Sequence, residues 1–379
     1  MISRENWTPE EFAGRWSRLQ QAMAVDGIDG MMAGEATNFF YLTGHESTQF
    51  LHRMRPLVFL LPQSGQPVIF VYAAEVPKLA HLKDIAVIKG YVDVPFPFDD
   101  LVELVRNLGW AEATIGAEIG PNQRLGMSLA EYVALQQAFP GARWVDGGRA
   151  LLETQAIKTE VEIGIIRKAC EISVLAWDQL LERIHPGVTT DEINRQLSLI
   201  NVELGADPNE PFSAHSTHLS LGATDGVLRP GDMLKCDFHS RFRGYQSDLC
   251  RLATVGEPTP DHIAWHAAQY GLLMECIEMV RPGLRVGDIA SHSNRRLVEM
   301  GQTPLHPIKR IGHGIGIETT SPPSINTLDD MVLQAGMTIA VEPRITVEIG
   351  ALLLEDSVLV TETGYDLLTS GAGTLGVIR

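Results

Sequence analysis

The sequence predicts a two-domain α/β protein, with a smaller N-terminal α/β domain over residues 1–150 and a second, larger domain over residues 157–379. Three observations lead to this fold class. The chain has 379 residues, which is long for one hydrophobic core. Short apolar runs alternate with helical patterns as far as residues 144–146. The second half repeats its own pattern at a nearly constant spacing.

The first half alternates helices and strands, as is typical of an α/β domain. Within residues 9–30, Phe12, Trp16, Leu19 and Met23 fall on one face, and this spacing predicts an amphipathic helix. Further along, the pattern predicts two strands within 54–73 around a turn at 62–65, a helix over 102–109, a buried strand over 113–120 and a helix over 128–139.

The second half opens with a long predicted helix from Glu160 to Ile184, which Pro186 and Gly187 terminate. Thr189 or Thr190 is predicted to cap the next helix.

The second half also contains a weak internal sequence repeat, called the internal echo below. PGVTTDEI at 186–193 resembles PGLRVGDI at 282–289, and GDMLKCD at 231–237 resembles GMTIAVE at 336–342. Asp248 and Glu355 are predicted on the next strand of each half. Two similar halves related by a pseudo-two-fold axis would bring their acidic residues to one central site.

Composition excludes several classes of protein. The formal net charge of −17 argues against nucleic-acid binding, which needs clustered Lys and Arg. No apolar stretch is long enough to span a membrane, and the N-terminal residues lack the apolar region of a signal peptide. The four cysteines form no CxxC pair, which is typical of reduced thiols in a cytoplasmic protein.

Acidic residues and one histidine stand at strand-like positions where a hard metal ion finds its ligands. Asp237 and Asp248 are expected to face each other across a hairpin that turns at 243–244. Each of these residues alone has an ordinary explanation, such as a strand-end turn residue, a hydrogen-bonded histidine or an ion pair. Together they predict a metal site made of Asp237, Asp248, His313, Glu342 and Glu355.

The blocks YQSDLCR, GHGIG, VEPRI and LLEDSVLV resemble those of the pita-bread metallopeptidases, the family of prolidase, aminopeptidase P, methionine aminopeptidase and creatinase. The resemblance covers roughly residues 157–379, and the first half resembles the creatinase/prolidase-type N-terminal domain. It implies a C-terminal α+β domain of the pita-bread fold, with pseudo-two-fold symmetry and with two divalent metal ions on the five residues.

By this resemblance Asp248 and Glu355 bridge the ions, Asp237 binds one of them, and His313 and Glu342 bind the other. Glu342 is also implied as the catalytic proton shuttle. Carboxylates with one imidazole suit Mn, Fe, Co or Zn, and the sequence does not choose among these metals.

The sequence departs from the family in the histidines that surround the metals and bind substrate. Ungapped comparison places Ser220, Lys309 and Thr320 at their positions. It also places Leu353 where an arginine usually precedes the last Glu. A local shift would let His215 or His218 replace the first histidine, and His239 is unusual. The predicted substrate-binding residues of this domain are therefore His215, His218, His239, Lys309 and Thr320.

The segment HESTQFLHRMRP at 45–56 follows a predicted strand end at 41–43 and carries Arg53 and Arg55. One interpretation is a solvated basic turn. The other follows creatinase-like dimers, where this region of one subunit reaches the active site of the other and an arginine binds a carboxylate. The second interpretation predicts a homodimer in which Arg53 and Arg55 bind substrate.

Three functional hypotheses result. The first is metal-dependent hydrolysis of an amide or other C–N bond in a small molecule or dipeptide, with specificity altered from that of Xaa-Pro dipeptidases. The second is a metal-dependent lyase acting on a small anionic substrate. The third is a non-catalytic binding module, for which a complete set of five ligands would have no purpose.

Overall fold

The computed structural model describes residues 7–51, 55–92, 95–208, 214–219, 226–304 and 310–379, with the backbone alone for residues 214 and 215. The chain divides into two compact units, Met1–Gln155 and Ala156–Arg379. Separate clusters of buried apolar side chains form the cores of the two units.

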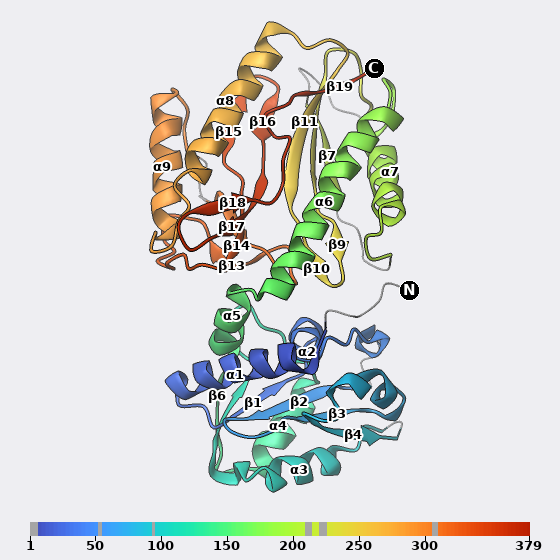
Figure 1. Cartoon of the computed structure of the whole chain (residues 1–379), viewed down its shortest axis with the longest axis vertical. Helices are drawn as coiled ribbons and strands as arrows, with labels where there is room; N and C mark the ends of the chain where they lie inside the picture. Colours follow the sequence, from blue (N-terminus) through green and yellow to red (C-terminus); the bar gives the residue numbers. More distant parts are fainter. Residues whose placement is uncertain (1–6, 52–54, 93–94, 209–213, 220–225, 305–309) are drawn as a thin grey trace. The chain divides into compact units, whose positions relative to one another are not determined.

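The N-terminal unit is built on a mixed sheet with the strand order β4-β3-β2-β1-β5-β6 (Figure 1). The strand bounds are β1 (Gly30–Ala33), β2 (Val58–Pro62), β3 (Val68–Tyr72), β4 (Val87–Tyr91), β5 (Thr114–Ala117) and β6 (Arg143–Asp146). The helices are α1 (Pro9–Asp26), α2 (Ala36–Thr43), η1 (Thr48–Leu51), η2 (Ala73–Leu82), α3 (Phe98–Asn107), η3 (Trp110–Glu112), α4 (Leu129–Ala138) and α5 (Gly148–Ala156).

Helix α1 buries the predicted stripe of Phe12, Trp16, Leu19 and Met23. It ends earlier than predicted, at Asp26, because Gly27 adopts a left-handed conformation with φ 64°. Strand β1 then begins at Gly30. The two strands predicted within 54–73 are present as the antiparallel pair β2 and β3.

One prediction for this unit is wrong. Residues 41–43 do not end a strand; they form the last turn of α2, and Gly44 closes that helix with φ 64°. The apolar run that looked like a strand is the buried face of a short helix, on which Phe39, Tyr41 and Leu42 are all inaccessible to solvent.

The C-terminal unit contains two sheets, with strand orders β19-β11-β8-β7 and β13-β12-β14-β17-β18, and the hairpins β9–β10 and β15–β16. Helices α6 (Glu160–Arg183) and α7 (Thr190–Glu203) pack with the first sheet, and α8 (Pro260–Ile277) and α9 (Val286–Glu299) lie together beside the second (Figure 1). The strand bounds are β7 (Ala214–Leu219), β8 (Met233–Phe238), β9 (Arg241–Phe242), β10 (Tyr245–Gln246), β11 (Leu249–Val255), β12 (Gly312–Gly314), β13 (Ser321–Ser324), β14 (Thr338–Val341), β15 (Arg344–Val347), β16 (Gly350–Leu353), β17 (Asp356–Val360), β18 (Tyr365–Leu367) and β19 (Gly376–Ile378).

The internal echo corresponds to repeated structure. In each half a helix pair accompanies an antiparallel strand pair, β8 with β11 and β14 with β17. An isolated bridge joins Thr189 to Val227 in the first half, and another joins Arg285 to Val332 in the second, at the sequence offsets of the echo. Thr189 caps α7 through its side chain, as predicted.

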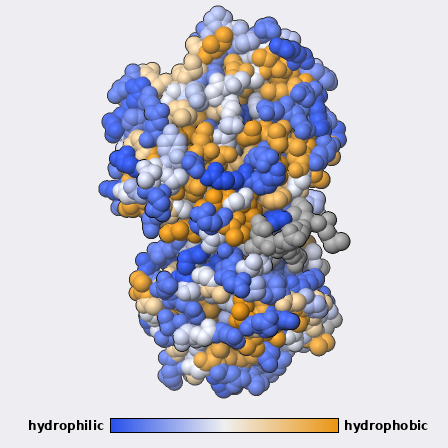
Figure 2. All heavy atoms as spheres, viewed as in Figure 1, coloured by the Kyte–Doolittle hydropathy of each residue, from blue (hydrophilic) through white to orange (hydrophobic). Residues whose placement is uncertain are grey.

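Hydrophilic and apolar side chains are intermingled on the visible face of each unit (Figure 2). Among the helices that the structure describes, none combines the length and the apolar character needed to cross a membrane.

Candidate metal centre

The five residues predicted as metal ligands all line one pocket of about 250 Å³ in the C-terminal unit. Four of them are carboxylates, and one is the imidazole of His313. Residues that lie more than a hundred positions apart in the sequence therefore meet at a single site, as expected from the internal echo.

The first half supplies Asp237 from β8 and Asp248 from the residue before β11. The prediction that the two face each other directly across the hairpin is wrong, because the register pairs Asp237 with Cys250. Asp248 precedes Cys250 by two residues and thus lies diagonally from Asp237 on the same face of the ladder. A diagonal placement still brings both carboxylates to the pocket.

The second half supplies His313 from β12, Glu342 from the residue after β14 and Glu355 from the residue before β17. Glu355 forms an isolated bridge with Cys250, in which each backbone N–H donates to the other residue's carbonyl, at 3.2 and 3.4 Å. The prediction that Asp248 and Glu355 lie within strands is thus wrong by one residue each. Cys250 has Asp237 opposite on one side and Glu355 on the other, so it is one of the residues through which the halves join.

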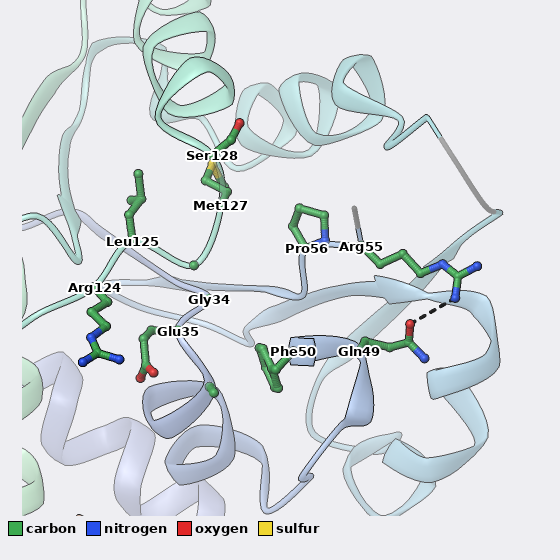
Figure 3. Close-up of a pocket in the computed structure, with 12 residues that line it drawn as sticks. Gly34, Glu35, Gln49, Phe50, Arg55, Pro56, Arg124, Leu125, Met127 and Ser128 are labelled. Atoms are coloured by element: carbon green, nitrogen blue, oxygen red, sulfur yellow. Dashed lines mark hydrogen bonds between the residues drawn. The ribbon is translucent and has the colours of Figure 1, made fainter. Parts of the chain in front are cut away.

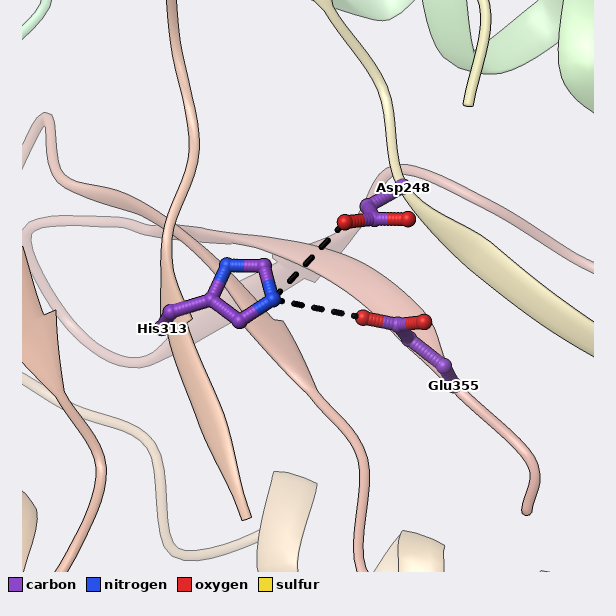
Figure 4. A group of neighbouring side chains, drawn as sticks. All are labelled: Asp248, His313 and Glu355. Carbon is purple, nitrogen blue, oxygen red and sulfur yellow. Dashed lines mark ion pairs between the residues drawn. The ribbon is translucent and has the colours of Figure 1, made fainter. Parts of the chain in front are cut away.

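His313 faces the carboxylates through Nε2 (Figure 4). That atom lies 3.7 Å from Asp248 Oδ2, 3.7 Å from Glu342 Oε1 and 3.9 Å from Glu355 Oε1. These separations are too long for hydrogen bonds. The other ring nitrogen, Nδ1, lies 3.2 Å from the Gly314 carbonyl, a contact that favours a proton on Nδ1 and leaves the Nε2 lone pair directed at the carboxylates.

The electrostatics of the pocket favour a bound cation. Burial, and then the neighbouring Asp237 and Glu342, raise the pKa of Asp248 well above its usual value. Burial, followed by Asp248 and Glu342, does the same to the pKa of Glu355. Burial lowers the pKa of His313, which keeps the ring neutral and able to act as a ligand.

One further observation shows that the residues fit divalent metal. Within the described part of the chain, Glu355 Oε1 is buried without a hydrogen-bond partner. A buried carboxylate oxygen that no donor satisfies is costly unless a cation or water meets it. Asp248, His313 and Glu355 each place a ligand atom within 4.8 Å of the others, a spread that one ion can span.

Buried side chains fix the backbone of Asp248 and Glu355, the two acids that directly precede β11 and β17. Ser357 Oγ donates to the Asp248 carbonyl at 2.6 Å. Arg251 donates through Nη1 to the Glu355 carbonyl at 2.6 Å and through Nη2 to Asp356 Oδ1 at 2.6 Å and the Ser370 carbonyl at 2.7 Å. Arg251 and Asp356 are each about 1% exposed, so this ion pair lies in the core directly behind the pocket.

Two of the predicted substrate-binding residues, His239 and Thr320, line the pocket, and Thr320 is exposed there. His218 is engaged elsewhere, since its Nε2 lies 2.5 Å from Asp232 Oδ2 in a buried pair. The backbone of His215 lies opposite Asp237 in the β7–β8 ladder, while its side chain is outside the described part of the chain. Lys309 and Ser220 also lie outside the described residues.

Two arginines that line the pocket, Arg310 and Arg344, were not predicted as site residues, although the sequence offered Arg344 as an ion-pair partner for Glu342. Arg344 Nη2 donates to Glu342 Oε2 at 2.8 Å, and Arg310 Nη2 to Glu342 Oε1 at 3.4 Å. The sequence did contain an indication of their role, because each arginine lies within three positions of a predicted metal ligand. Arg344 also lies directly opposite Leu353 in the β15–β16 ladder, so a guanidinium occurs across the hairpin from the position where the sequence lacks one.

In the N-terminal unit, Arg55 lines a separate pocket of about 500 Å³. Its Nη1 donates to Gln49 Oε1 at 3.2 Å (Figure 3), and its guanidinium lies 4.3 Å from the centroid of the Tyr72 ring. Arg55 is therefore held by a hydrogen bond and a cation–π contact within the N-terminal unit. Arg53 lies outside the described residues.

The crowded carboxylates lead to a prediction for the metal-free protein. Because the folded-state pKa values of Asp248 and Glu355 are raised, their contribution to stability is fully present below the unfolded value of about 4. It is lost as the pH rises through the raised folded values. Urea unfolding of EDTA-treated protein should therefore show a free energy of unfolding that falls as the pH rises above about 4, and Mn(II) should restore it.

Glu355→Gln removes one of these charges while keeping the shape of the side chain, so this variant is expected to show a flatter pH dependence without metal. Equal slopes for wild type and variant would contradict this account of the pocket's electrostatics.

The fold and the pocket together define a metal-dependent hydrolase with a pita-bread catalytic domain. The model of "Metallopeptidase family M24" matches residues 164–362, and that of "Creatinase/Prolidase N-terminal domain" matches residues 15–155. The chain belongs to metallopeptidase family M24.

Relatives match along nearly their whole length. An Xaa-Pro dipeptidase of Pyrococcus furiosus is 26% identical, with 94% of this chain and 97% of the relative covered. An ectoine hydrolase of Halomonas elongata is 25% identical, with 96% of each covered. Among solved structures, the prolidase of Thermococcus sibiricus has a TM-score of 0.83 at 20% identity, over 97% of this chain and 99% of that one. At 20% sequence identity, this structural similarity supports the fold and not the function.

The family implies divalent metal ions, in agreement with the chemistry of the pocket. The hydrolase hypothesis is favoured over the lyase hypothesis, since both named relatives are hydrolases. The relatives likewise favour an enzyme over a non-catalytic binding module.

Proposed function

We propose that this enzyme hydrolyses an amide or other C–N bond in a small substrate and that it differs in specificity from Xaa-Pro dipeptidases. The convergence of Asp237, Asp248, His313, Glu342 and Glu355 on one pocket carries the proposal. The altered specificity is supported by Thr320, which lines the pocket where the sequence comparison expects a histidine. The name of the Halomonas elongata relative supports it too, since ectoine is not a dipeptide.

The five residues would hold two divalent ions, of Mn, Co, Fe or Zn. Asp248 and Glu355 would be shared by both ions, Asp237 would bind one, and His313 and Glu342 would bind the other. Bound divalent ions supply Lewis acidity, which activates water and polarises the scissile carbonyl.

Glu342 is proposed as the proton carrier. Its carboxylate lies at the pocket, only 4% exposed, and would take a proton from the attacking water and return it to the leaving nitrogen. Arg344 and Arg310 each contact one of its oxygens, which fixes its orientation.

This proposal predicts slow cleavage of Xaa-Pro substrates. Loss of one hydrogen-bond donor to a developing oxyanion typically costs about 2.7–4 kcal/mol. Thr320 offers only a short neutral hydroxyl at the rim of the pocket. We therefore expect kcat/KM below about 10⁴ M⁻¹s⁻¹ for Gly-Pro, Ala-Pro and Xaa-Pro-Xaa peptides with metal-loaded enzyme.

The same preparation should be assayed against a panel of small amides and cyclic C–N substrates, ectoine included. Faster turnover of a panel member than of any proline peptide is the expected result. A value above 10⁴ M⁻¹s⁻¹ on a proline dipeptide would place the enzyme with the prolidases instead.

We further propose a homodimer in which Arg55 of one subunit helps to read the substrate of the other. Arg55→Ala should raise KM for an anionic substrate about tenfold, the scale of one charge-assisted hydrogen bond, with unchanged metal content. Arg106→Ala is the matched control, because Arg106 also lies over an aromatic ring in the N-terminal unit. Equal KM values for both variants and wild type would favour a solvated turn at 45–56.

The four cysteines are all buried free thiols, which supports the proposal of a reducing, cytoplasmic location.

A further inference from the structure

Two guanidinium groups lie in the metal pocket alongside the carboxylates. Arg310 directly follows residues 305–309, just before β12, and Arg344 begins β15. They are 32% and 34% exposed, whereas the Glu342 carboxylate between them is 4% exposed. Both arginines therefore lie at the mouth of the pocket, where an entering molecule would meet them.

Their contacts leave much of their hydrogen-bonding capacity unused. A guanidinium has five N–H donors. Within the described residues, Arg344 uses Nη2 for Glu342 Oε2, and its Nε is buried without a partner. Among the residues that the structure describes, Arg310 makes one long hydrogen bond, 3.4 Å from Nη2 to Glu342 Oε1. An ion pair whose only purpose was to hold Glu342 would not need two cations with so many donors left.

The charge balance points in the same direction. Four carboxylates line the pocket, and two divalent cations would neutralise them. The guanidiniums of Arg310 and Arg344 then leave the loaded pocket with an excess of positive charge, which attracts an anion. Planar guanidiniums match a carboxylate geometrically, because two parallel N–H groups reach its two oxygens.

We infer that Arg310 and Arg344 form a carboxylate-binding pair that selects substrates with a carboxylate group close to the scissile C–N bond. The inference rests on the proposed function and names the substrate class of the same site. Arg344 reaches the pocket from the first residue of β15, opposite Leu353 of β16, so a short hairpin fixes its position. Neutral amides of equal size would lack the carboxylate–guanidinium contact and would bind more weakly.

A matched pair of hydroxamates tests the inference without a known substrate. Hydroxamates chelate divalent metal, so succinic acid monohydroxamate and butyrohydroxamate should both bind the Mn(II)-loaded protein, and only the first carries a carboxylate. Isothermal titration calorimetry should show roughly tenfold to hundredfold tighter binding of the succinic compound to wild type. This preference should weaken as NaCl is raised, because it is electrostatic.

Arg344→Gln and Arg310→Gln should each reduce the preference severalfold, and the double variant should abolish it, with metal content unchanged by elemental analysis. Arg344→Lys keeps the positive charge but loses the planar pair of N–H donors, so it should retain part of the preference. Arg195→Gln is the control, because it removes an exposed arginine paired with Glu192 on α7. It should leave the preference intact.

Equal affinities of wild type for the two hydroxamates, or a preference that survives in the double variant, would overturn the inference and leave the metal proposal standing. Binding of neither compound would instead overturn the metal proposal and the inference with it. The salt dependence of wild type gives a result even if the arginine variants fold poorly, since a salt-independent preference also contradicts the inference.

Discussion

Asp248→Ala and Glu355→Ala are each expected to abolish turnover and to lower the metal content of the purified protein. Both carboxylates are buried, and both lie within reach of His313 Nε2. Removing either would take a shared ligand from the proposed pair of ions. The expected loss in kcat is at least about a thousandfold, the upper end for removing one group that stabilises developing charge.

The controls for this experiment separate ligand loss from unfolding. Without metal, each variant should be at least as stable as wild type to urea at neutral pH, because one member of a crowded acidic cluster has been removed. Glu342→Gln should also lose activity, with a milder effect on metal content, since Glu342 is the proposed proton carrier as well as a ligand. Full metal content and turnover in Asp248→Ala would rule out the proposed ligand set.

Arg251→Met is expected to destabilise the C-terminal unit by about 3–5 kcal/mol, the usual result of leaving one partner of a buried ion pair alone. Arg251 donates to Asp356 and to the carbonyls of Cys250, Glu355 and Ser370. Its loss would leave a buried carboxylate unpaired and carbonyl groups unsatisfied. Because one of these carbonyls belongs to Glu355, metal affinity should fall as well.

Urea unfolding of the metal-free variant measures the change in the free energy of unfolding. Titration with Mn(II) measures the change in metal affinity. Arg167→Met is the matched control, because Arg167 pairs with Asp366 at the surface, where an ion pair contributes about 0–1 kcal/mol. A change of less than about 1 kcal/mol in Arg251→Met would show that the pair does not hold the strands behind the pocket.

The sequence predicted those features that depend on local pattern. The buried stripe of α1 follows from 3.6-residue periodicity, and the cap of α7 from the chemistry of Thr189. The candidate ligands could be found because the internal echo and the family resemblance both placed them at equivalent points of two halves.

Features that depend on register and on partners distant in sequence could not be predicted. The diagonal relation of Asp237 and Asp248 is set by the pairing of Asp237 with Cys250, which no local pattern encodes. His218 looked available for substrate until the fold placed Asp232, the residue before β8, beside it. Arg344 enters the pocket because β15 pairs with β16, a contact between short strands of weak pattern.

Metal analysis of protein purified without added metal, followed by EDTA treatment and reconstitution, tests the central claim most directly. The account predicts about two divalent ions per chain at full occupancy, loss of turnover when EDTA removes them, and recovery with Mn, Co, Fe or Zn. Protein that holds no divalent metal, and whose activity EDTA leaves untouched, would contradict it.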